Sequence, residues 1–234
     1  TYAVGAAIAA KFLKARLGDV MNQTIYAYIS DGGIQEEISQ GAGRVAGTLG
    51  LDNLIMFYDS NNIQLSTTVE EVTTENVAMK YEAWGWKVIS INGNDVNEIR
   101  KALDEAKAET QRPTLIIGDT IMGKGARGAD DSSYENKVST HGQPLSAAGA
   151  SIEETIKNLG GDPKNPFTVF TDVAELYAKR AKELEAIVAE RYAAKEAWAK
   201  ANPELAEKMQ FWFSGKAPKL DWEAIEQKAN QATR

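Results

Sequence analysis

Two polar residues of this chain each follow an apolar run and carry oxygen atoms that could hold a metal ion. Asp31 follows the apolar residues 26–29, and Asn61 follows the apolar residues 54–58. In an open parallel sheet, ligands bind beyond the carboxyl ends of the strands, so we expect Asp31 and Asn61 to converge there. A carboxylate and a carboxamide oxygen are hard ligands that suit Mg²⁺ or Ca²⁺ better than Zn²⁺.

The two glycines after Asp31 add a second feature to this expected site. Gly32 and Gly33 let the backbone come close to whatever the ion carries. The start of the helix expected behind them favours a phosphate group. The pattern therefore predicts a site for a divalent cation and a phosphorylated ligand.

Other interpretations of the same residues are open. An aspartate before glycine is often only a turn former, and an asparagine pair is a common turn as well. Glu36 could be a charge that interacts with a helix N-terminus. His141 is the only histidine and stands among glycines rather than on an apolar face, which favours a functional role.

The elements that must position these residues alternate between strands and helices. We expect strands at residues 26–29, 54–58, 87–91 and 114–118, and helices at residues 34–49, 68–84 and 95–109. Such alternation predicts an α/β fold in which helices flank a parallel sheet with right-handed crossovers. The run at residues 114–118 is apolar throughout, which is typical of a strand covered on both faces.

The second half of the chain has a different texture. Residues 123–140 predict a long loop that leads to His141, with Lys124 and Arg127 in a solvated, mobile part of it. A short helix is expected at residues 146–159 and a long one at residues 170–201.

The chain ends and the domain division follow from the same patterns. Residues 1–10 read as a buried helix, which predicts that the chain begins inside a domain. The aromatic residues 211–213 and Trp222 are expected to pack against something. We expect an α/β domain over residues 1–165, truncated at its N-terminus, and a helical extension and connector over residues 166–234.

Composition excludes several classes of protein. A chain of 234 residues can form one large α/β domain or a domain with an extension. Its formal net charge of −7 argues against non-specific binding of nucleic acid. The absence of cysteine excludes disulfides and thiolate zinc sites. No apolar run approaches the roughly 18–20 residues that a membrane helix needs.

Several blocks of the sequence resemble transketolase, a thiamine diphosphate enzyme. The segment from Asp31 to Ser39 resembles the family's Gly-Asp-Gly-x-x-x-Glu-Gly-Ile-Ser motif. Further blocks follow in the family's order: Ala46-Gly47-Thr48-Leu49, Tyr58-Asp59-Ser60-Asn61, Tyr81-Glu82-Ala83-Trp84-Gly85-Trp86, Gly93-Asn94-Asp95, Thr120-Ile121-Met122-Gly123-Lys124-Gly125 and Thr140-His141-Gly142-Gln143-Pro144-Leu145. The resemblance covers most of residues 3–150 and weakens beyond residue 165.

The resemblance implies a cofactor site built from these blocks. Asp31, Asn61 and the backbone carbonyl of Ile63 would bind the divalent ion, Mg²⁺ or Ca²⁺. Gly32 would offer its backbone N–H to the diphosphate of thiamine diphosphate.

It also implies roles for four residues around that site. Leu65 and Met122 would line the cofactor pocket. His141 would reach the diphosphate and the substrate side of the cofactor. Glu36 would belong to a relay that joins the two active sites of a homodimer.

At the level of function, the resemblance implies transfer of a two-carbon ketol unit between sugar phosphates, in the pentose phosphate pathway and the cytoplasm. Two departures qualify this expectation. Ser30 replaces the first glycine of the motif and would be strained at a positive φ. The pyrimidine-binding domain and several substrate histidines of the family have no counterpart here, so we expect the isolated chain to be inactive.

Three other identities are compatible with the sequence. The chain could be the N-terminal subunit of a split-gene transketolase, or part of a related enzyme such as dihydroxyacetone synthase or deoxyxylulose-phosphate synthase. It could also be a non-catalytic interaction module that keeps the fold without binding cofactor.

Overall fold

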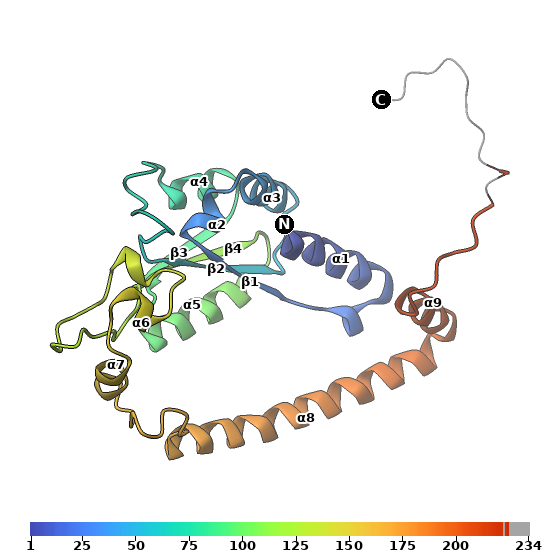
Figure 1. Cartoon of the computed structure of the whole chain (residues 1–234). Helices are drawn as coiled ribbons and strands as arrows, with labels where there is room; N and C mark the ends of the chain where they lie inside the picture. Colours follow the sequence, from blue (N-terminus) through green and yellow to red (C-terminus); the bar gives the residue numbers. More distant parts are fainter. Residues whose placement is uncertain (222, 225–234) are drawn as a thin grey trace. The chain divides into compact units, whose positions relative to one another are not determined.

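A parallel four-stranded sheet organises the computed structural model, which describes residues 1–221 and 223–224 (Figure 1). Its strands are β1 (Ile25–Ser30), β2 (Leu54–Ser60), β3 (Lys87–Asn92) and β4 (Thr114–Asp119). They lie in the order β1-β2-β4-β3, and every neighbouring pair is parallel. The predicted α/β fold and its four strands are therefore confirmed.

Helices cover both faces of the sheet (Figure 1). One face carries α1 (Tyr2–Leu17), α2 (Asp31–Gln35), α3 (Glu37–Thr48) and α4 (Val77–Ala83), and the other carries α5 (Val96–Ala108). A short 3-10 helix, η1 (Asp19–Met21), joins α1 to the first strand.

Strand β2 supplies side chains to the core on both faces. Leu54, Met56 and Tyr58 pack in the cluster that includes residues of α1, α2, α3 and α4. Ile55 packs with Ala102 of α5 in the second cluster. Successive side chains of a strand point to opposite faces, so this alternation places Tyr58 and Asp59 on opposite sides of the sheet.

The turn after α4 packs directly against α3. Trp86 is buried, and its indole N–H donates to the Gly43 carbonyl oxygen at 2.8 Å. A Cβ on Gly47 would lie 1.8 Å from the Trp84 carbonyl oxygen. The small residues of α3 thus allow a close approach of two backbones.

Two predicted helices are shorter than expected. The helix predicted at residues 34–49 is broken at Glu36, whose extended backbone (φ −61°, ψ 129°) separates α2 from α3. The helix predicted at residues 68–84 begins only at Val77, because the Asn76 side chain accepts from the Met79 N–H at 3.0 Å and caps α4. Residues 68–76 are irregular.

The second half contains η2 (Val138–Thr140), α6 (Leu145–Ala148) and α7 (Ile152–Asn158). A left-handed Gly149 interrupts the single helix that was predicted at residues 146–159. After α7 come the long helix α8 (Thr171–Ala201), as predicted, and α9 (Pro203–Phe213).

The chain divides into two compact units, Thr1–Arg180 and Ala181–Arg234. In the second unit Met209 is buried, whereas Phe213 is 65% exposed. Trp222 lies outside the described residues.

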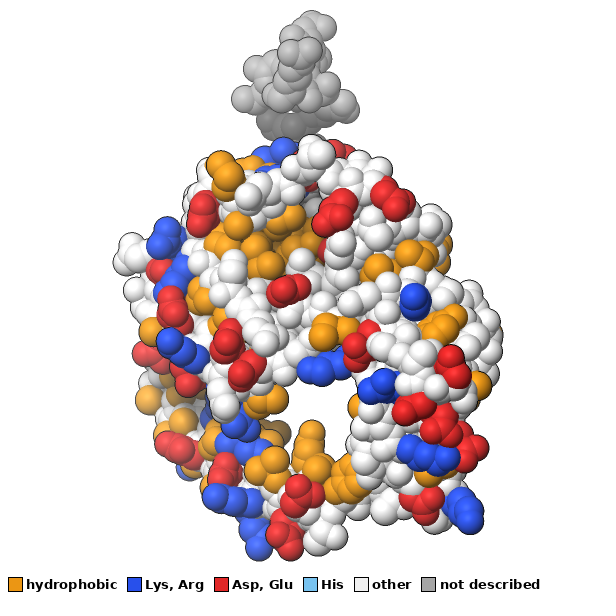
Figure 2. All heavy atoms as spheres, turned by 90° about the vertical axis from the view of Figure 1, so that its left-hand side faces the viewer, with side chains coloured by type: hydrophobic (Ala, Val, Ile, Leu, Met, Phe, Trp, Pro, Cys, Tyr) orange, Lys and Arg blue, Asp and Glu red, His pale blue; other side chains and the backbone are white. Residues whose placement is uncertain are grey.

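No described helix is both long and apolar enough to cross a membrane. The face drawn in Figure 2 intersperses acidic and basic side chains.

Candidate functional site

Asp31 is the first residue of α2 and lies directly beyond the end of β1. Its side chain is buried, with 1% exposed. One carboxylate oxygen, Oδ1, accepts from the Tyr58 hydroxyl at 2.5 Å, and the other, Oδ2, accepts from the Asn61 backbone N–H at 3.1 Å. The two residues predicted to converge therefore do so, at the carboxyl edge of the sheet.

The Tyr58 hydroxyl, which makes this contact, has a pKa that is raised by its surroundings. Its side chain is 4% exposed. Burial, followed by the hydrogen bond to Asp31, raises the pKa of the Tyr58 phenol well above its usual value. Tyr58 is therefore a neutral donor that holds the Asp31 carboxylate in place.

The Asn61 side chain bridges two neighbours. Its Oδ1 accepts from the Ile63 backbone N–H at 3.0 Å, and its Nδ2 donates to Asp59 Oδ1 at 3.4 Å. Asn62, between the two residues, has a left-handed backbone with φ 63°, which asparagine tolerates better than most residues. This tight turn brings residue 63 back toward the end of the strand.

The oxygen atoms of Asp31, Asn61 and Ile63 can accept further bonds and so could bind a cation. An ionised carboxylate offers about four lone-pair sites, and Asp31 uses two of them here. Asn61 Oδ1 uses one of its two. Within the described part of the chain, no backbone donor bonds to the Ile63 carbonyl oxygen. This donor set fits a hard cation such as Mg²⁺ or Ca²⁺.

The set contains a single acidic side chain. Among the described residues, no group of three His, Cys, Asp or Glu side chains is placed to hold a metal ion. A cation held here would therefore take further ligands from outside the chain, as a diphosphate would provide.

Tyr58 and Asp59 support the site, and sequence analysis assigned neither of them a role. Both belong to the quoted Tyr-Asp-Ser-Asn block, so the signal was present. A tyrosine inside an apolar strand needs a partner for its hydroxyl when buried, which could have pointed to Asp31.

The backbone around Gly32 is open and unstrained. A Cβ on Gly32 would meet nothing within 4 Å, so the backbone is accessible there. Ser30, which replaces a glycine of the motif, has φ −108° and ψ 176°, an extended conformation that any residue adopts. Ser30 is therefore free of the strain that a positive φ would bring.

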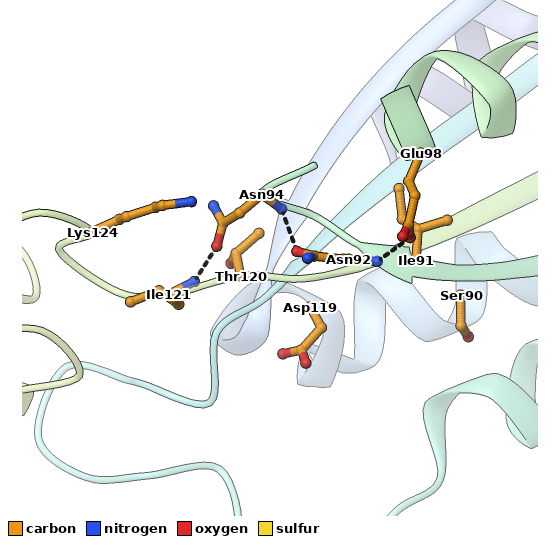
Figure 3. A pocket seen from close by; sticks show the side chains of 9 residues that line it. All are labelled: Ser90, Ile91, Asn92, Asn94, Glu98, Asp119, Thr120, Ile121 and Lys124. Carbon is orange, nitrogen blue, oxygen red and sulfur yellow. Dashed lines mark hydrogen bonds between the residues drawn. The ribbon is translucent and has the colours of Figure 1, made fainter. Parts of the chain in front are cut away.

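Two cavities open at the carboxyl edge of the sheet. One, of about 680 Å³, is lined by Asp31, Tyr58, Asp119 and part of the segment 69–78. The other, also about 680 Å³, is lined by residues of the β3 and β4 ends, among them Thr120 and Lys124 (Figure 3).

The turn after β3 forms one wall of the second cavity. Asn94 Oδ1 accepts from the Ile121 N–H at 3.1 Å, and the Asn94 N–H donates to Asn92 Oδ1 at 3.0 Å (Figure 3). Thr120 hydrogen-bonds to Asp59 as well. The tips of β2, β3 and β4 are thus linked by polar contacts.

Leu65, Met122 and His141 are linked through the two loops that carry them. A Cβ on Gly142 would lie 4.0 Å from Leu65 Cδ1, so Leu65 lies beside the His141 loop. The Met122 carbonyl oxygen accepts from the Asn136 N–H at 2.9 Å, which folds the long loop back on itself. His141 Nδ1 is buried and has no hydrogen-bond partner among the described residues.

The long loop is anchored, contrary to the expectation of a mobile segment around Arg127. The Arg127 guanidinium donates to the Asp131 carbonyl oxygen at 3.2 Å and to Asn158 Oδ1 at 3.1 Å. Asn158 Nδ2 in turn donates to the Gly125 carbonyl oxygen at 2.9 Å. These bonds tie the loop to α7. Lys124 is exposed, as expected.

Glu36 lies at the break between α2 and α3 and is exposed. Its carbonyl oxygen accepts from the Ser39 N–H at 2.9 Å, as the N-cap residue of α3. The acidic side chain therefore stands at a helix N-terminus, and the relay role remains a prediction.

Comparison with protein families gives one match over nearly the whole chain. The family described as "Transketolase, thiamine diphosphate binding domain" matches residues 1–218. The match includes every residue of the candidate site.

Individual relatives agree with this match. A transketolase of Staphylococcus epidermidis is 37% identical over 223 residues, which are 90% of this chain and 31% of that protein. A dihydroxyacetone synthase of Pichia angusta is 32% identical, over 95% of this chain and 31% of that protein.

A solved structure supports the fold. The transketolase of Pichia stipitis, solved as a complex with sedoheptulose 7-phosphate, superposes with a TM-score of 0.82 at 30% identity. The superposition covers 93% of this chain and 32% of that one. The chain thus spans about a third of the length of the relatives that it matches.

Proposed function

The chain belongs to the transketolase family, as its thiamine diphosphate binding domain, and on this basis we propose that it holds the diphosphate and the divalent cation of that cofactor. The observation that supports this proposal most is the contact between Asp31 and Asn61 at the end of two parallel strands. Asp31, Asn61 and the Ile63 carbonyl would bind Mg²⁺ or Ca²⁺, and the cation would offset the charge of the diphosphate.

The remaining predicted residues have roles that follow from their positions. The exposed backbone of Gly32 would donate its N–H to the diphosphate. Leu65 and Met122 would give the cofactor an apolar wall. His141, whose Nδ1 is buried without a partner in the described structure, would donate or accept a proton near the diphosphate.

We propose that the chain contributes to ketol transfer between sugar phosphates. Thiamine diphosphate, when bound, supplies the electron sink for cleavage of a carbon–carbon bond. The chain's own residues would position the cofactor and neutralise its charge. Because one relative is a dihydroxyacetone synthase, the reaction of that enzyme is the second candidate function.

We also propose that the isolated chain is inactive and that its working form is a homodimer. The relatives are about three times longer, so a pyrimidine-binding domain would come from a polypeptide segment outside this chain. Glu36 would then take part in a relay between the two active sites. Ketol transfer by the 234-residue chain alone would contradict the first part, and a strict monomer in light scattering would contradict the second.

Isothermal calorimetry with thiamine diphosphate, with and without Mg²⁺, tests the binding proposal. We expect Mg²⁺-dependent binding by the wild-type chain and its loss in Asp31→Ala, because this substitution removes the one carboxylate among the three proposed cation ligands. Asp119→Ala is the matched control, since it removes a carboxylate from the same cavity. Equal binding by Asp31→Ala and the wild type would contradict the proposal and favour a non-catalytic interaction module.

A further inference from the structure

Asp59 lies near the end of β2, the strand that leads directly to Asn61 of the candidate site. Its carboxylate accepts hydrogen bonds from three different segments. Oδ2 accepts from the Tyr28 hydroxyl of β1 at 2.5 Å. Oδ1 accepts from the Thr120 hydroxyl after β4 and from Asn61 Nδ2 at 3.4 Å. The carboxylate therefore links three strand ends.

The contact with Asn61 has a specific consequence for the carboxamide of that residue. An asparagine carboxamide can sit in two orientations that exchange its oxygen and its NH₂ group. In the observed orientation, Nδ2 meets the Asp59 carboxylate and Oδ1 meets the Ile63 N–H at 3.0 Å. The reverse orientation would place oxygen against a carboxylate and NH₂ against an N–H donor.

We propose that Asp59 is a positioning residue, which fixes the Asn61 carboxamide so that its oxygen is available as a cation ligand. This inference rests on the proposed cation site. Asp59 accepts from Asn61 on the face of the sheet opposite Tyr58. The Tyr58 hydroxyl donates to the Asp31 carboxylate and holds that ligand. Consecutive residues of β2 thus orient the two side-chain ligands, one from each side of the sheet.

Outer groups that orient metal ligands have a known energetic weight. Their substitution typically lowers metal affinity by about 10- to 100-fold. We therefore expect Asp59→Ala to lower the affinity for Mg²⁺, titrated in the presence of thiamine diphosphate, by about 10- to 100-fold. Asp59→Asn keeps an acceptor for Asn61 Nδ2 and should recover part of the loss, because its effect is limited to the missing charge.

The test combines a Mg²⁺ titration in the presence of thiamine diphosphate with NMR of the Asn61 side-chain NH₂ group. The NMR spectra are recorded on the chain without cofactor or metal. The proton that faces Asp59 should resonate downfield in the wild type and move upfield in Asp59→Ala. Tyr28→Phe is the matched control, since it removes a donor from the other carboxylate oxygen and leaves the Asn61 contact intact. Its Asn61 signals should stay close to those of the wild type.

The outcomes separate the inference from the proposed function. Unchanged Asn61 NH₂ signals in both folded Asp59 variants would overturn the inference. Equal losses of Mg²⁺ affinity in Asp59→Ala and Asp59→Asn would also overturn it, because charge alone would then explain the effect. Absence of Mg²⁺-dependent binding by the wild type would contradict the proposed function, while the NMR signals would still decide the orientation of Asn61.

Discussion

At the scale of single residues, the site depends on holding a buried carboxylate in place. A buried charge is costly unless it is hydrogen-bonded, and Asp31 has partners for both of its oxygens. The positions of Asp31 and Asn61 could be predicted, because each follows an apolar run. The buried Tyr58 signalled that its hydroxyl needs a partner. Which residues Tyr58 and Tyr28 contact could not be predicted with certainty, because both contacts depend on the register between β1 and β2, which the sequence leaves open.

The Tyr58 hydroxyl should contribute measurably to stability. Tyr58→Phe leaves one buried oxygen of Asp31 without its donor. Hydrogen bonds to charged groups contribute about 1.5–3 kcal/mol, so we expect a loss of about 2 kcal/mol in the free energy of unfolding by urea. Tyr26→Phe, at a side chain that is 56% exposed, should change it little. A Tyr58→Phe variant as stable as the wild type would show that the contact carries no weight.

At the scale of elements, strands were easier to predict than helix ends. Apolar runs at residues 54–58 and 114–118 gave β2 and β4 within two residues at each end. Helix boundaries were missed where a local contact decides them, as at the Asn76 cap of α4. The anchoring of the long loop was missed for a different reason, because it depends on a contact between Arg127 and Asn158, which are 31 residues apart in the chain.

The close approach of α3 to the turn after α4 gives a matched pair of substitutions in one helix. In Gly47→Ala the new Cβ would lie 1.8 Å from the Trp84 carbonyl oxygen. We expect a loss of about 3 kcal/mol or more in the free energy of unfolding, because backbone has to move.

Gly41→Ala is the control in the same helix. Its Cβ would meet nothing within 4 Å, so alanine should raise stability by up to about 1 kcal/mol through its better helix propensity. Urea unfolding of both variants measures the difference. Similar stabilities would contradict the close packing of α3 against the Trp84 backbone.

At the scale of the whole molecule, three tyrosines couple stability to alkaline pH. Partial desolvation and then the hydrogen bond to Asp59 raise the pKa of Tyr28 to about 12, although its side chain is 67% exposed. Burial raises the pKa of Tyr81 to about 12. The pKa of Tyr58 is raised as well. An unfolded tyrosine has a pKa of about 10. Above that pH the unfolded chain loses protons that the folded chain keeps.

Stability should therefore be constant with respect to these groups below about pH 10 and fall as the pH rises from 10 toward 12. Urea unfolding at a series of pH values, with tyrosine ionisation followed by absorbance, measures this fall. Tyr81→Phe should show a shallower decline, because one late-titrating group is removed. A stability that rises over this range would contradict the assignment.

The most direct test of the cation site is a crystal structure of the chain grown with thiamine diphosphate and Mn²⁺, in which anomalous scattering locates the ion. We predict one peak at about 2.1 Å from an Asp31 carboxylate oxygen, Asn61 Oδ1 and the Ile63 carbonyl oxygen, the bond length of the octahedral Mg²⁺ that Mn²⁺ would replace. An ordered cofactor whose Mn²⁺ peak lies away from Asp31 and Asn61 would contradict the account.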